Sequence, residues 1–312
     1  MSSESYLGID LGGTTVKLGI CDADGVVRAR ASLDTEVERG PDDAMARIAH
    51  AARALVAGGR VDACGAGVPG EIDRDRRVLV RAHHFPGWTN VGIGERLAAM
   101  LGVPTALEND ANCAAWGELC AGAGRGARSL ACFTLGTGVG GGVVIDGELW
   151  TGANGAAGAF GHIVVDPRGP ECPCGQRGCL EQYASATALA RRFGRGSARE
   201  AFEAARRGDA RAVAAIDWAC DGLAAGVATV IHVMQPEVVV LGGGMAAAGD
   251  ALLERVRGGV ARRVRAAWLT HVRIVGSTLG DDAGWVGAAL RGARQVRDVE
   301  RAVPRTTSAV RP

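Results

Sequence analysis

The sequence lacks any segment that would direct the chain out of the cytoplasm. Its N-terminus, MSSESYLGID, has no basic stretch followed by an apolar one, and no apolar run approaches the length needed to span a bilayer. A secreted protein or a membrane protein is therefore not expected. We predict a cytoplasmic protein.

An excess of charge of either sign is also missing. The formal net charge is +1 over 312 residues. Binding to nucleic acid or to an anionic membrane normally requires a basic excess, so we expect neither partner. Small uncharged or self-neutralised ligands fit this composition better.

Lysine is almost absent from the chain. Of the 35 basic residues only Lys17 is a lysine, and it lies next to a Gly-Gly-Thr turn. An isolated lysine in this place suggests that a compact ammonium group is needed there, although a GC-rich genome would explain the many arginines equally well.

The cysteines do not form the even, regularly spaced set of a disulfide framework. There are nine of them, and three lie within the segment CPCGQRGC. The others are scattered through apolar segments, which indicates free thiols in a reducing compartment. These other cysteines are Cys21, Cys64, Cys113, Cys120, Cys132 and Cys220.

What the sequence does contain is enough apolar material for two cores. With 47% hydrophobic and 22% charged residues, the chain is typical of a soluble globular protein of two lobes. Strand-like and helix-like segments alternate, which predicts mostly parallel or mixed α/β sheets. The expected strands are 6–11, 15–21, 26–31, 63–68, 105–108, 132–135, 142–145, 238–241 and 272–275; the expected helices are 42–57, 93–101, 111–121, 184–193, 198–207, 210–234, 250–264 and 282–294.

One strand–turn–strand unit occurs twice. The strand 6–11 runs into LGGT and the strand 132–135 runs into LGTG, and each return strand is followed by an Asp-Gly turn at nearly the same offset. This indicates an internal duplication with two lobes facing each other across a cleft. We expect a small lobe of residues 1–118 plus a helix at about 282–297, a large lobe of residues 119–281, and a disordered tail from 298 to 312.

A dense set of metal ligands lies near the middle of the chain. Cys172, Cys174 and Cys179, with His162 upstream, form the three-sulfur, one-nitrogen set of a closed structural zinc site. No coordination position remains for a catalytic water, so the predicted Zn²⁺ would fix a loop and position His162 and Glu181. A chance cluster of buried or disulfide-bonded cysteines is the alternative.

The segment DLGGTTVK is a candidate phosphate clamp. Paired glycines let backbone N–H groups approach an anion, threonines offer hydroxyls, and an aspartate at the strand end can hold Mg²⁺ through water. The segment does not match the GxxxxGK[ST] loop of P-loop NTPases. A hairpin turn with a solvated lysine is the alternative. The candidate residues are Asp10, Gly12, Gly13, Thr14, Thr15 and Lys17.

Two later glycine runs support a nucleotide site. GTGVGGG repeats the first turn, and two opposed turns can hold the two ends of a triphosphate. LGGG follows a strand and precedes a helix, leaving room for a flat adenine, although a glycine run can equally reflect close packing. The candidate residues are Gly136, Thr137, Gly138, Gly243 and Gly244.

The segment LENDAN delivers Asn109 and Asp110 to the start of a helix. Asp110 could act as the general base that takes a proton from a sugar hydroxyl, while Asn109 hydrogen-bonds a neighbouring hydroxyl. Alternatively, Asp110 could simply cap the helix. A position between two phosphate clamps and beside a zinc-stiffened loop favours the catalytic role.

Taken together, these motifs resemble the ROK family of bacterial sugar kinases and repressors. DLGGTTVK, ENDAN, GTGVGGG, GANGAAGAFGH and CPCGQRGCLE occur in the order and approximate spacing of that family, from about residue 6 to residue 294. The resemblance implies a duplicated actin-like, ribonuclease-H-like ATPase fold, with ATP and Mg²⁺ as co-substrates. It also implies a homodimer.

The same resemblance implies roles for individual residues. Asp110 would be the catalytic base, and zinc would be bound by His162 and the three clustered cysteines. The Pro-Gly-Trp turn at residues 86–88 makes glucokinases the nearest group. The expected sugar-binding residues are Asn109, His162, Glu181, Gly70 of the Pro-Gly turn, and Ala159.

Ala159 is also where the chain departs from the family. The kinases usually read Glu-x-Gly-His, and here Ala159 replaces the glutamate. Loss of that acceptor would weaken glucose binding by roughly 1.5–3 kcal/mol. The change is compatible with an engineered substitution, with a weaker glucokinase, or with a pocket remade for an amino or N-acyl hexose such as kanosamine, N-acetylmannosamine or N-acetylglucosamine. His84, where the family often has asparagine, points to the third account.

The resulting interpretation is an ATP-dependent hexose kinase acting on the 6-hydroxyl, with glucose as the first candidate. A sugar-responsive transcription factor is the rival, because the family includes repressors with a helix-turn-helix before the first glycine turn. Only nine residues precede Asp10, so no such element is expected. A non-catalytic sugar sensor is the remaining alternative, because of Ala159.

Overall fold

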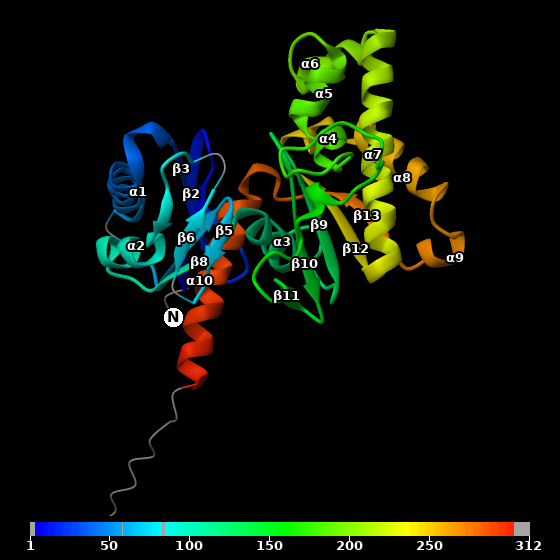
Figure 1. Ribbon diagram of the computed structural model, residues 1–312. Helices are drawn as coiled ribbons and strands as arrows, with labels where there is room; N and C mark the ends of the chain where they lie inside the picture. Colours follow the sequence, from blue (N-terminus) through cyan, green and yellow to red (C-terminus); the bar gives the residue numbers. More distant parts are fainter. Residues whose placement is uncertain (1–3, 58, 76, 83–84, 303–312) are drawn as a thin grey trace, which may run out of the picture.

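The computed structural model describes residues 4–57, 59–75, 77–82 and 85–302, and it shows two lobes, each built around a five-stranded sheet (Figure 1). The first sheet has the order β3-β2-β1-β4-β8 and the second the order β11-β10-β9-β12-β13. The strands of the first are β1 (Ser5–Leu11), β2 (Thr15–Asp22), β3 (Val27–Asp34), β4 (Ala63–Val68) and β8 (Thr105–Asn109); those of the second are β9 (Leu130–Leu135), β10 (Val139–Ile145), β11 (Glu148–Trp150), β12 (Val238–Gly242) and β13 (Arg273–Gly276).

The two sheets have the same topology. In each, the first strand pairs antiparallel with the second and the second with the third, while the first also pairs parallel with the fourth and the fourth with the fifth. This repetition confirms the internal duplication that the paired glycine turns predicted. The mixed α/β class is confirmed as well.

A third, small sheet was not predicted. It has the order β5-β6-β7 and consists of β5 (Glu71–Asp73), β6 (Val78–Arg81) and β7 (Thr89–Val91). Strands this short carry too few residues for a period-2 pattern to be read from sequence. The sheet lies beside β8, because β5 contacts that strand.

Each lobe has helices on its outer side. In the first lobe, η1 (Val37–Arg39) leads into α1 (Gly40–Val56), which packs against α2 (Ile93–Leu101) and the sheet. In the second lobe, α7 packs against four other helices, namely α4, α5, α6 and α8. The elements of the second lobe are η2 (Phe160–His162), α4 (Glu181–Ala184), α5 (Ala186–Phe193), α6 (Ala198–Arg206), α7 (Ala210–Met234), η3 (Gly244–Ala248), α8 (Asp250–Ala261), α9 (Ala266–Leu269) and η4 (Gly280–Asp282).

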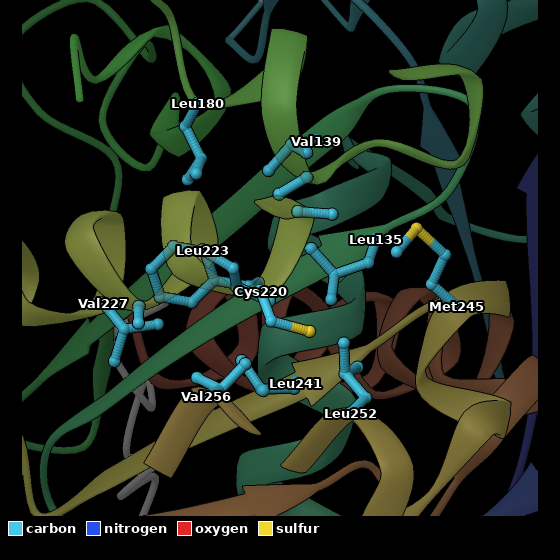
Figure 2. Packing of buried hydrophobic residues seen from close by; sticks show 14 of the residues in the cluster. Leu135, Val139, Leu180, Cys220, Leu223, Val227, Leu241, Met245, Leu252 and Val256 are labelled. Atoms are coloured by element: carbon cyan, nitrogen blue, oxygen red, sulfur yellow. The ribbon is translucent and has the colours of Figure 1, made fainter. Parts of the chain in front are cut away.

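The central strands alternate between two cores. In β12, Val239 and Leu241 face the core of the second lobe, whereas Val238 and Val240 face a core that both lobes share. Figure 2 shows the first of these cores, where Leu241 lies among Cys220, Val256 and other side chains from the helices. Both faces of this strand are therefore buried, which explains why its sequence is a continuous apolar run.

The length and hydrophobicity of the helix α7 contradict the expectation about apolar runs. No apolar run was expected to be long enough to span a bilayer, but by length and composition alone α7 could cross one. In the structure, 67% of its most apolar window is buried. Its apolar residues include Ile216, Leu223 and Val227, which belong to the core of the second lobe. Burial inside a folded lobe accounts for its hydrophobicity.

Two helices, α3 (Asp110–Ala121) and α10 (Ala283–Ala302), join the lobes. The helix α10 packs on β1 and β4 of the first sheet, α3 packs on β9 and β10 of the second, and the two helices pack on each other. The shared core between the sheets is built around them and includes Trp116 and Trp285. In Figure 1 both helices lie between the two sheets.

Glycines allow these helices to approach backbone to backbone. A Cβ atom added to Gly287 of α10 would lie 1.7 Å from the carbonyl oxygen of Cys113 in α3, and one added to Gly8 of β1 would lie 1.8 Å from the carbonyl oxygen of Trp285. No side-chain rearrangement could relieve contacts with main-chain atoms. The contact between α3 and α10 therefore requires glycine at position 287, and the contact between α10 and β1 requires it at position 8.

The last helix is longer than expected. The tail was expected to begin at residue 298, but α10 continues to Ala302. Residues 303–312 lie outside the described residues, as does His84.

We predict that the Gly287→Ala variant lowers the free energy of unfolding by about 3 kcal/mol, because the added Cβ pushes α10 away from α3. The matched control is Gly258→Ala in α8, where the nearest atom to an added Cβ is the end of the Arg262 side chain at 3.8 Å. This variant should raise the free energy of unfolding by about 0.5–1 kcal/mol, because alanine favours a helix. Urea unfolding measures both, and similar effects at the two positions would contradict the packing argument.

Candidate active site

The candidate site begins at the carboxyl ends of three neighbouring parallel strands. Asp10 of β1 lies opposite Gly67 of β4, and Gly67 in turn lies opposite Glu108 of β8. Ligands of α/β sheets commonly bind at the carboxyl ends of parallel strands. The parallel pairing of these strands thus brings the first glycine turn and the segment 108–110 to the same end of the first sheet.

Asn109, rather than Asp110, caps the helix α3. The side-chain oxygen of Asn109 accepts hydrogen bonds from the N–H groups of Ala111 and Asn112 at 3.0 and 3.2 Å, and its side-chain nitrogen donates to the carbonyl of Gly70 at 3.4 Å. Asp110 is the first residue of the helix and accepts from the N–H of Ala111 at 2.8 Å. The capping role that was the alternative for Asp110 is therefore performed by Asn109.

The start of α3 also contacts the second lobe. A Cβ atom added to Gly140 of β10 would lie 3.0 Å from the Cβ atom of Ala111, and one added to Gly67 of β4 would lie 3.4 Å from the Cα atom of Asp110. Asp110 therefore lies where the end of the first sheet meets the return strand of the second glycine turn.

Two carboxylates are close enough to influence each other at this place. Burial raises the pKa of Asp10 to about 7, and the negative charge of Asp110 adds to the increase, while Lys17 opposes it. The Asp10 carboxyl group lies at the start of α10, where a Cβ on Gly284 would be 2.5 Å from its Oδ2 atom. Two neighbouring acids, one of them desolvated, are expensive for stability, and carboxyl groups with such shifted pKa values are typical of functional sites.

The first glycine turn is held by Thr35, a residue that no sequence motif had indicated. The buried side chain of Thr35 donates to the carbonyl of Gly12 at 2.7 Å, and its backbone N–H donates to the carbonyl of Thr14 at 2.8 Å. These bonds occupy carbonyl groups of the turn. Gly13 and Thr14 are exposed, and the ammonium of Lys17 lies 3.3 Å from the exposed carboxylate of Asp281.

The second glycine turn is tied to Glu181. The Oε2 atom of Glu181 accepts a hydrogen bond from the N–H of Val139 at 3.0 Å, and a Cβ on Gly138 would lie 2.4 Å from the same atom. Glycine at 138 is therefore needed for the carboxylate to reach the turn. Thr137 is exposed, and a Cβ on Gly136 would meet no atom within 4 Å, so the outer side of the turn is open.

The third glycine run lies directly behind the second turn. Gly243 has a φ of +81°, and an added Cβ would lie 2.6 Å from the backbone N and O atoms of Leu135. Gly244 is exposed and faces open space. The structure thus brings the two glycine runs of the second lobe together.

The cysteine cluster forms as predicted. The ligand atoms of His162, Cys172, Cys174 and Cys179 all lie within 4.8 Å of one another, and the sulfurs of Cys174 and Cys179 are 3.6 Å apart. Zn–S bonds of about 2.3 Å in a tetrahedron place two sulfurs roughly 3.8 Å apart, so the residues fit the ion. The side-chain nitrogen of Gln182 lies 3.8 Å from the sulfur of Cys172 and can donate to a thiolate. All nine cysteines of the chain are free thiols, so the disulfide alternative is wrong.

The metal-binding loop positions the remaining candidates. Ala159 precedes the single turn of η2, which ends at His162, and the N–H of His162 donates to the carbonyl of Ala159 at 3.0 Å. The N–H of Leu180 donates to the carbonyl of Ile163 at 2.8 Å, which joins this turn to the cysteine hairpin. Both Ala159 and His162 are exposed.

Two buried glutamates of the helix α3 region were missed. Glu108 is 2% exposed, and its Oε2 atom lies 3.1 Å from Nε of Arg74. Glu118 is fully buried and accepts from the hydroxyl of Ser277 at 2.5 Å and from the N–H of Leu279 at 3.1 Å. Glu108 lies within the segment LENDAN, where only Asn109 and Asp110 were assigned roles. Glu118 belongs to no motif, and its only signal was a glutamate within an otherwise buried segment.

We predict that the Asp10→Asn variant stabilises the protein in the absence of nucleotide and Mg²⁺, but only at high pH. Because the pKa of Asp10 is raised from its ordinary value of 3.8 to about 7, the unfolded chain releases this proton before the folded chain does. Stability therefore falls as the pH rises from about 4 to about 7, by roughly 2–4 kcal/mol. Asparagine mimics the neutral acid and removes this loss. Urea unfolding at pH 4.5 and at pH 8 tests the sign, and an equal effect at both values would contradict it.

We also predict about one Zn²⁺ per chain, measured by plasma mass spectrometry after dialysis. The Cys174→Ser variant should lose most of the metal, because serine is a poor zinc ligand at neutral pH. Cys120→Ser serves as the control, since this cysteine is partly buried and lies outside the cluster. Equal zinc contents in the two variants would show that the cluster does not bind the metal.

Comparison with known proteins finds sugar kinases that are similar to this chain along most of its length. The chain is 40% identical over 308 residues to a glucokinase of Thermotoga maritima, covering 93% of this chain and 97% of the relative. It is 34% identical over 296 residues to an N-acetylmannosamine kinase of Citrobacter koseri, covering 92% of this chain and 98% of the relative.

Among solved structures, the fold matches a ROK family glucokinase from Streptomyces griseus in complex with glucose and AMPPNP. The TM-score is 0.83 at 33% identity, and the match covers 93% of this chain and 99% of the other. The family model for the ROK family matches residues 6–292. The chain therefore belongs to the ROK family and has its two-lobed, actin-like and ribonuclease-H-like fold.

Proposed function

We propose that this protein is an ATP-dependent hexose kinase that transfers the γ-phosphoryl group of ATP to the 6-hydroxyl of a hexose, with glucose as the first candidate. The observation that carries the proposal is the position of Asp110. It starts α3 beside the strand ends of the first lobe and against β10 of the second, and the capping role is already taken by Asn109. The related glucokinases and the solved glucose complex support the substrate class.

Asp110 would act as the general base. Its carboxylate takes the proton from the 6-hydroxyl as the new O–P bond forms, while the bond between the γ-phosphorus and the bridging oxygen breaks and ADP leaves. Asn109, Gly70, Ala159, His162 and Glu181 would line the sugar site. Asn109 and Gly70 already contact each other, and Glu181 is fixed against the second turn.

The glycine turns would hold the nucleotide. Gly12, Gly13, Thr14, Thr15 and Lys17 would bind phosphate oxygens from one side and Gly136, Thr137 and Gly138 from the other, with the adenine near Gly243 and Gly244. Asp10 would hold Mg²⁺ through water, and the ion would supply neutralisation of the charge on the transferred phosphate. A raised pKa means that Asp10 accepts a cation in place of a proton near neutral pH.

Zinc would be bound by His162, Cys172, Cys174 and Cys179, and would supply rigidity rather than reactivity. The ion would fix the hairpin that ends at Glu181. Zinc and sugar would therefore meet at His162, where one ring nitrogen serves the metal and the other is available to a hydroxyl.

A kinase for an amino or N-acyl hexose is the second candidate. Ala159 is exposed and leaves space where a glutamate is usual, and the chain is similar along most of its length to an N-acetylmannosamine kinase. An N-acyl group would fill that space, whereas a glucose hydroxyl there would lack a charged acceptor.

The same proposal extends to the two lobes, the cellular compartment and the oligomeric state. We propose that residues 1–118 with the helix at about 282–297 form the small lobe, that residues 119–281 form the large lobe, and that closure of the two excludes water during transfer. Nine free thiols support a reducing compartment, so we place the enzyme in the cytoplasm. The homodimer stays a prediction by analogy with the family.

We predict that the Asp110→Asn variant lowers kcat by about 10³-fold or more, while the dissociation constants for sugar and ATP change little, because only the proton acceptor is lost. Asn109→Ala provides the contrast, since it removes the cap of α3 and should lower the free energy of unfolding by about 1 kcal/mol. Coupled ADP-release assays and calorimetric titrations measure these effects. Turnover that survives in Asp110→Asn would remove Asp110 from the catalytic role.

We further predict that the Ala159→Glu variant raises kcat/KM for glucose by about 10- to 100-fold, because a carboxylate restores a charge-assisted hydrogen bond to a ring hydroxyl. It should not improve turnover of N-acetylmannosamine. An assay over glucose, mannose, glucosamine, kanosamine, N-acetylglucosamine and N-acetylmannosamine, with both forms of the enzyme, tests this. A wild-type preference for an N-acyl hexose would favour the second candidate.

A further inference from the structure

Arg74 connects the two lobes next to the candidate site. It directly follows β5 of the small sheet, and its guanidinium makes two different contacts. The Nε atom lies 3.1 Å from Oε2 of Glu108 at the end of β8, and the NH1 group donates a hydrogen bond at 2.9 Å to the hydroxyl of Thr151, which follows β11 in the second sheet. One side chain thus contacts both halves of the duplicated fold.

On the first side, Arg74 acts on the strand end that carries Asp110. Glu108 is 2% exposed, and its second oxygen, Oε1, accepts from the backbone N–H of Asn109 and from the side chain of Asn112, both at 3.0 Å. The position of this carboxylate therefore sets the backbone at Asn109, one residue before Asp110. A cation at Oε2 holds the carboxylate in place.

On the second side, Arg74 holds the base of a loop. The N–H of Ala157 donates to the carbonyl of Thr151 at 3.1 Å, which closes the loop 151–157 on the residue that Arg74 binds. A Cβ on Gly155 would lie 3.3 Å from NH2 of Arg74, so the loop also passes close to the guanidinium. This loop leads directly into Ala159 and His162.

An arginine suits this double role better than a lysine would. Its planar fork presents several N–H groups in fixed directions. The NH1 group hydrogen-bonds the hydroxyl of Thr151, while the guanidinium charge pairs with the Glu108 carboxylate without a hydrogen bond, since neither Nε of Arg74 nor Oε2 of Glu108 has a hydrogen-bond partner among the described residues. The chain also retains a second cation near Glu108, because NH2 of Arg291 in α10 lies 3.8 Å from Oε2. Loss of Arg74 therefore does not leave the buried carboxylate without a counter-charge.

We propose that Arg74 is a positioning residue that couples the strand end at Asn109–Asp110 to the sugar-site loop at residues 151–159 across the two lobes. Its kinetic consequence rests on the proposed hexose kinase activity. Without Arg74, each half of the site stays folded, but the general base and the sugar-site loop are no longer held in a fixed position relative to each other. Nucleotide binding at the glycine turns is not affected.

The kinetic test compares Arg74→Met, Arg74→Lys and Thr151→Val. The methionine variant should lower kcat/KM for the sugar by about 100-fold, because displacement of reacting groups by a fraction of an ångström to one ångström has effects of this size. It should leave KM for ATP within about 2-fold of the wild type. The lysine variant should lie between, since it keeps the charge but not the fork.

The double variant Arg74→Met/Thr151→Val tests whether the bond across the lobes is responsible. Thr151→Val should lower kcat/KM for the sugar by about 10-fold, and combining it with Arg74→Met should add little to the loss already caused by Arg74→Met. The matched control is Arg81→Met, in the same small sheet. Arg81 forms an exposed ion pair with Glu71 at 2.8 Å, and its removal should leave the kinetics unchanged.

A measurement that does not depend on turnover separates this proposal from the proposed function. In hydrogen–deuterium exchange of the free protein, Arg74→Met should increase exchange in residues 151–158 and also in residues 109–112, whereas Arg81→Met should change neither. A wild type that phosphorylates no sugar would overturn the kinase proposal, and exchange alone would then decide the coupling. Unchanged exchange at both segments, or a lowered melting temperature with unchanged kcat/KM, would overturn the role of Arg74.

Discussion

The contact between the backbones of α3 and α10 is the constraint on which the rest of the structure depends. Gly287 and Gly117 leave no Cβ atoms between the two helices, so their axes approach closely. Because α10 also packs on the first sheet and α3 on the second, this pair holds the two lobes together through one shared core. A helix whose first residue is Asp110 is thereby placed at the end of one sheet and against the other.

This arrangement brings acidic groups together at some cost to stability. Asp10 ends a strand, Asp110 starts a helix, and each raises the energy of the other in its charged form. A protein under pressure for stability alone would place a neutral residue at one of these positions. Retaining both carboxylates fits a site that is completed by a cation and a phosphorylated nucleotide, since binding of these groups removes the repulsion.

The long segment between β11 and α4 is organised by contacts with parts of the chain that are distant in sequence. At its start, Thr151 is bound by Arg74; at its end, Leu180 enters the core of the second lobe, as Figure 2 shows, and Glu181 accepts a hydrogen bond from Val139. The cysteine cluster lies between these anchors. A segment with so little secondary structure of its own needs such links to hold side chains in a defined geometry.

The amino-acid sequence by itself indicated most of the elements, the duplication and the cluster of one histidine and three cysteines. Apolar periodicity and glycine turns are local signals, and the ligands of the cluster are close together in the chain, so spacing alone was sufficient to predict them. The strand bounds were predicted to within a few residues for most elements, while β5, β6, β7 and β11, of three or four residues each, were not predicted because they are too short to leave a pattern. The order and spacing of the motifs also indicated the family.

Only the tertiary structure decided which residues work together. The sequence left open whether Asp110 caps α3, and the folded chain assigns the cap to Asn109. Glu108 lies in the segment LENDAN without a role of its own being indicated, and Arg74 belongs to no motif; the hydroxyl that Arg74 binds comes from the other lobe. Contacts between residues far apart in the chain depend on how the lobes pack, and this packing is set by backbone approaches that no local pattern records.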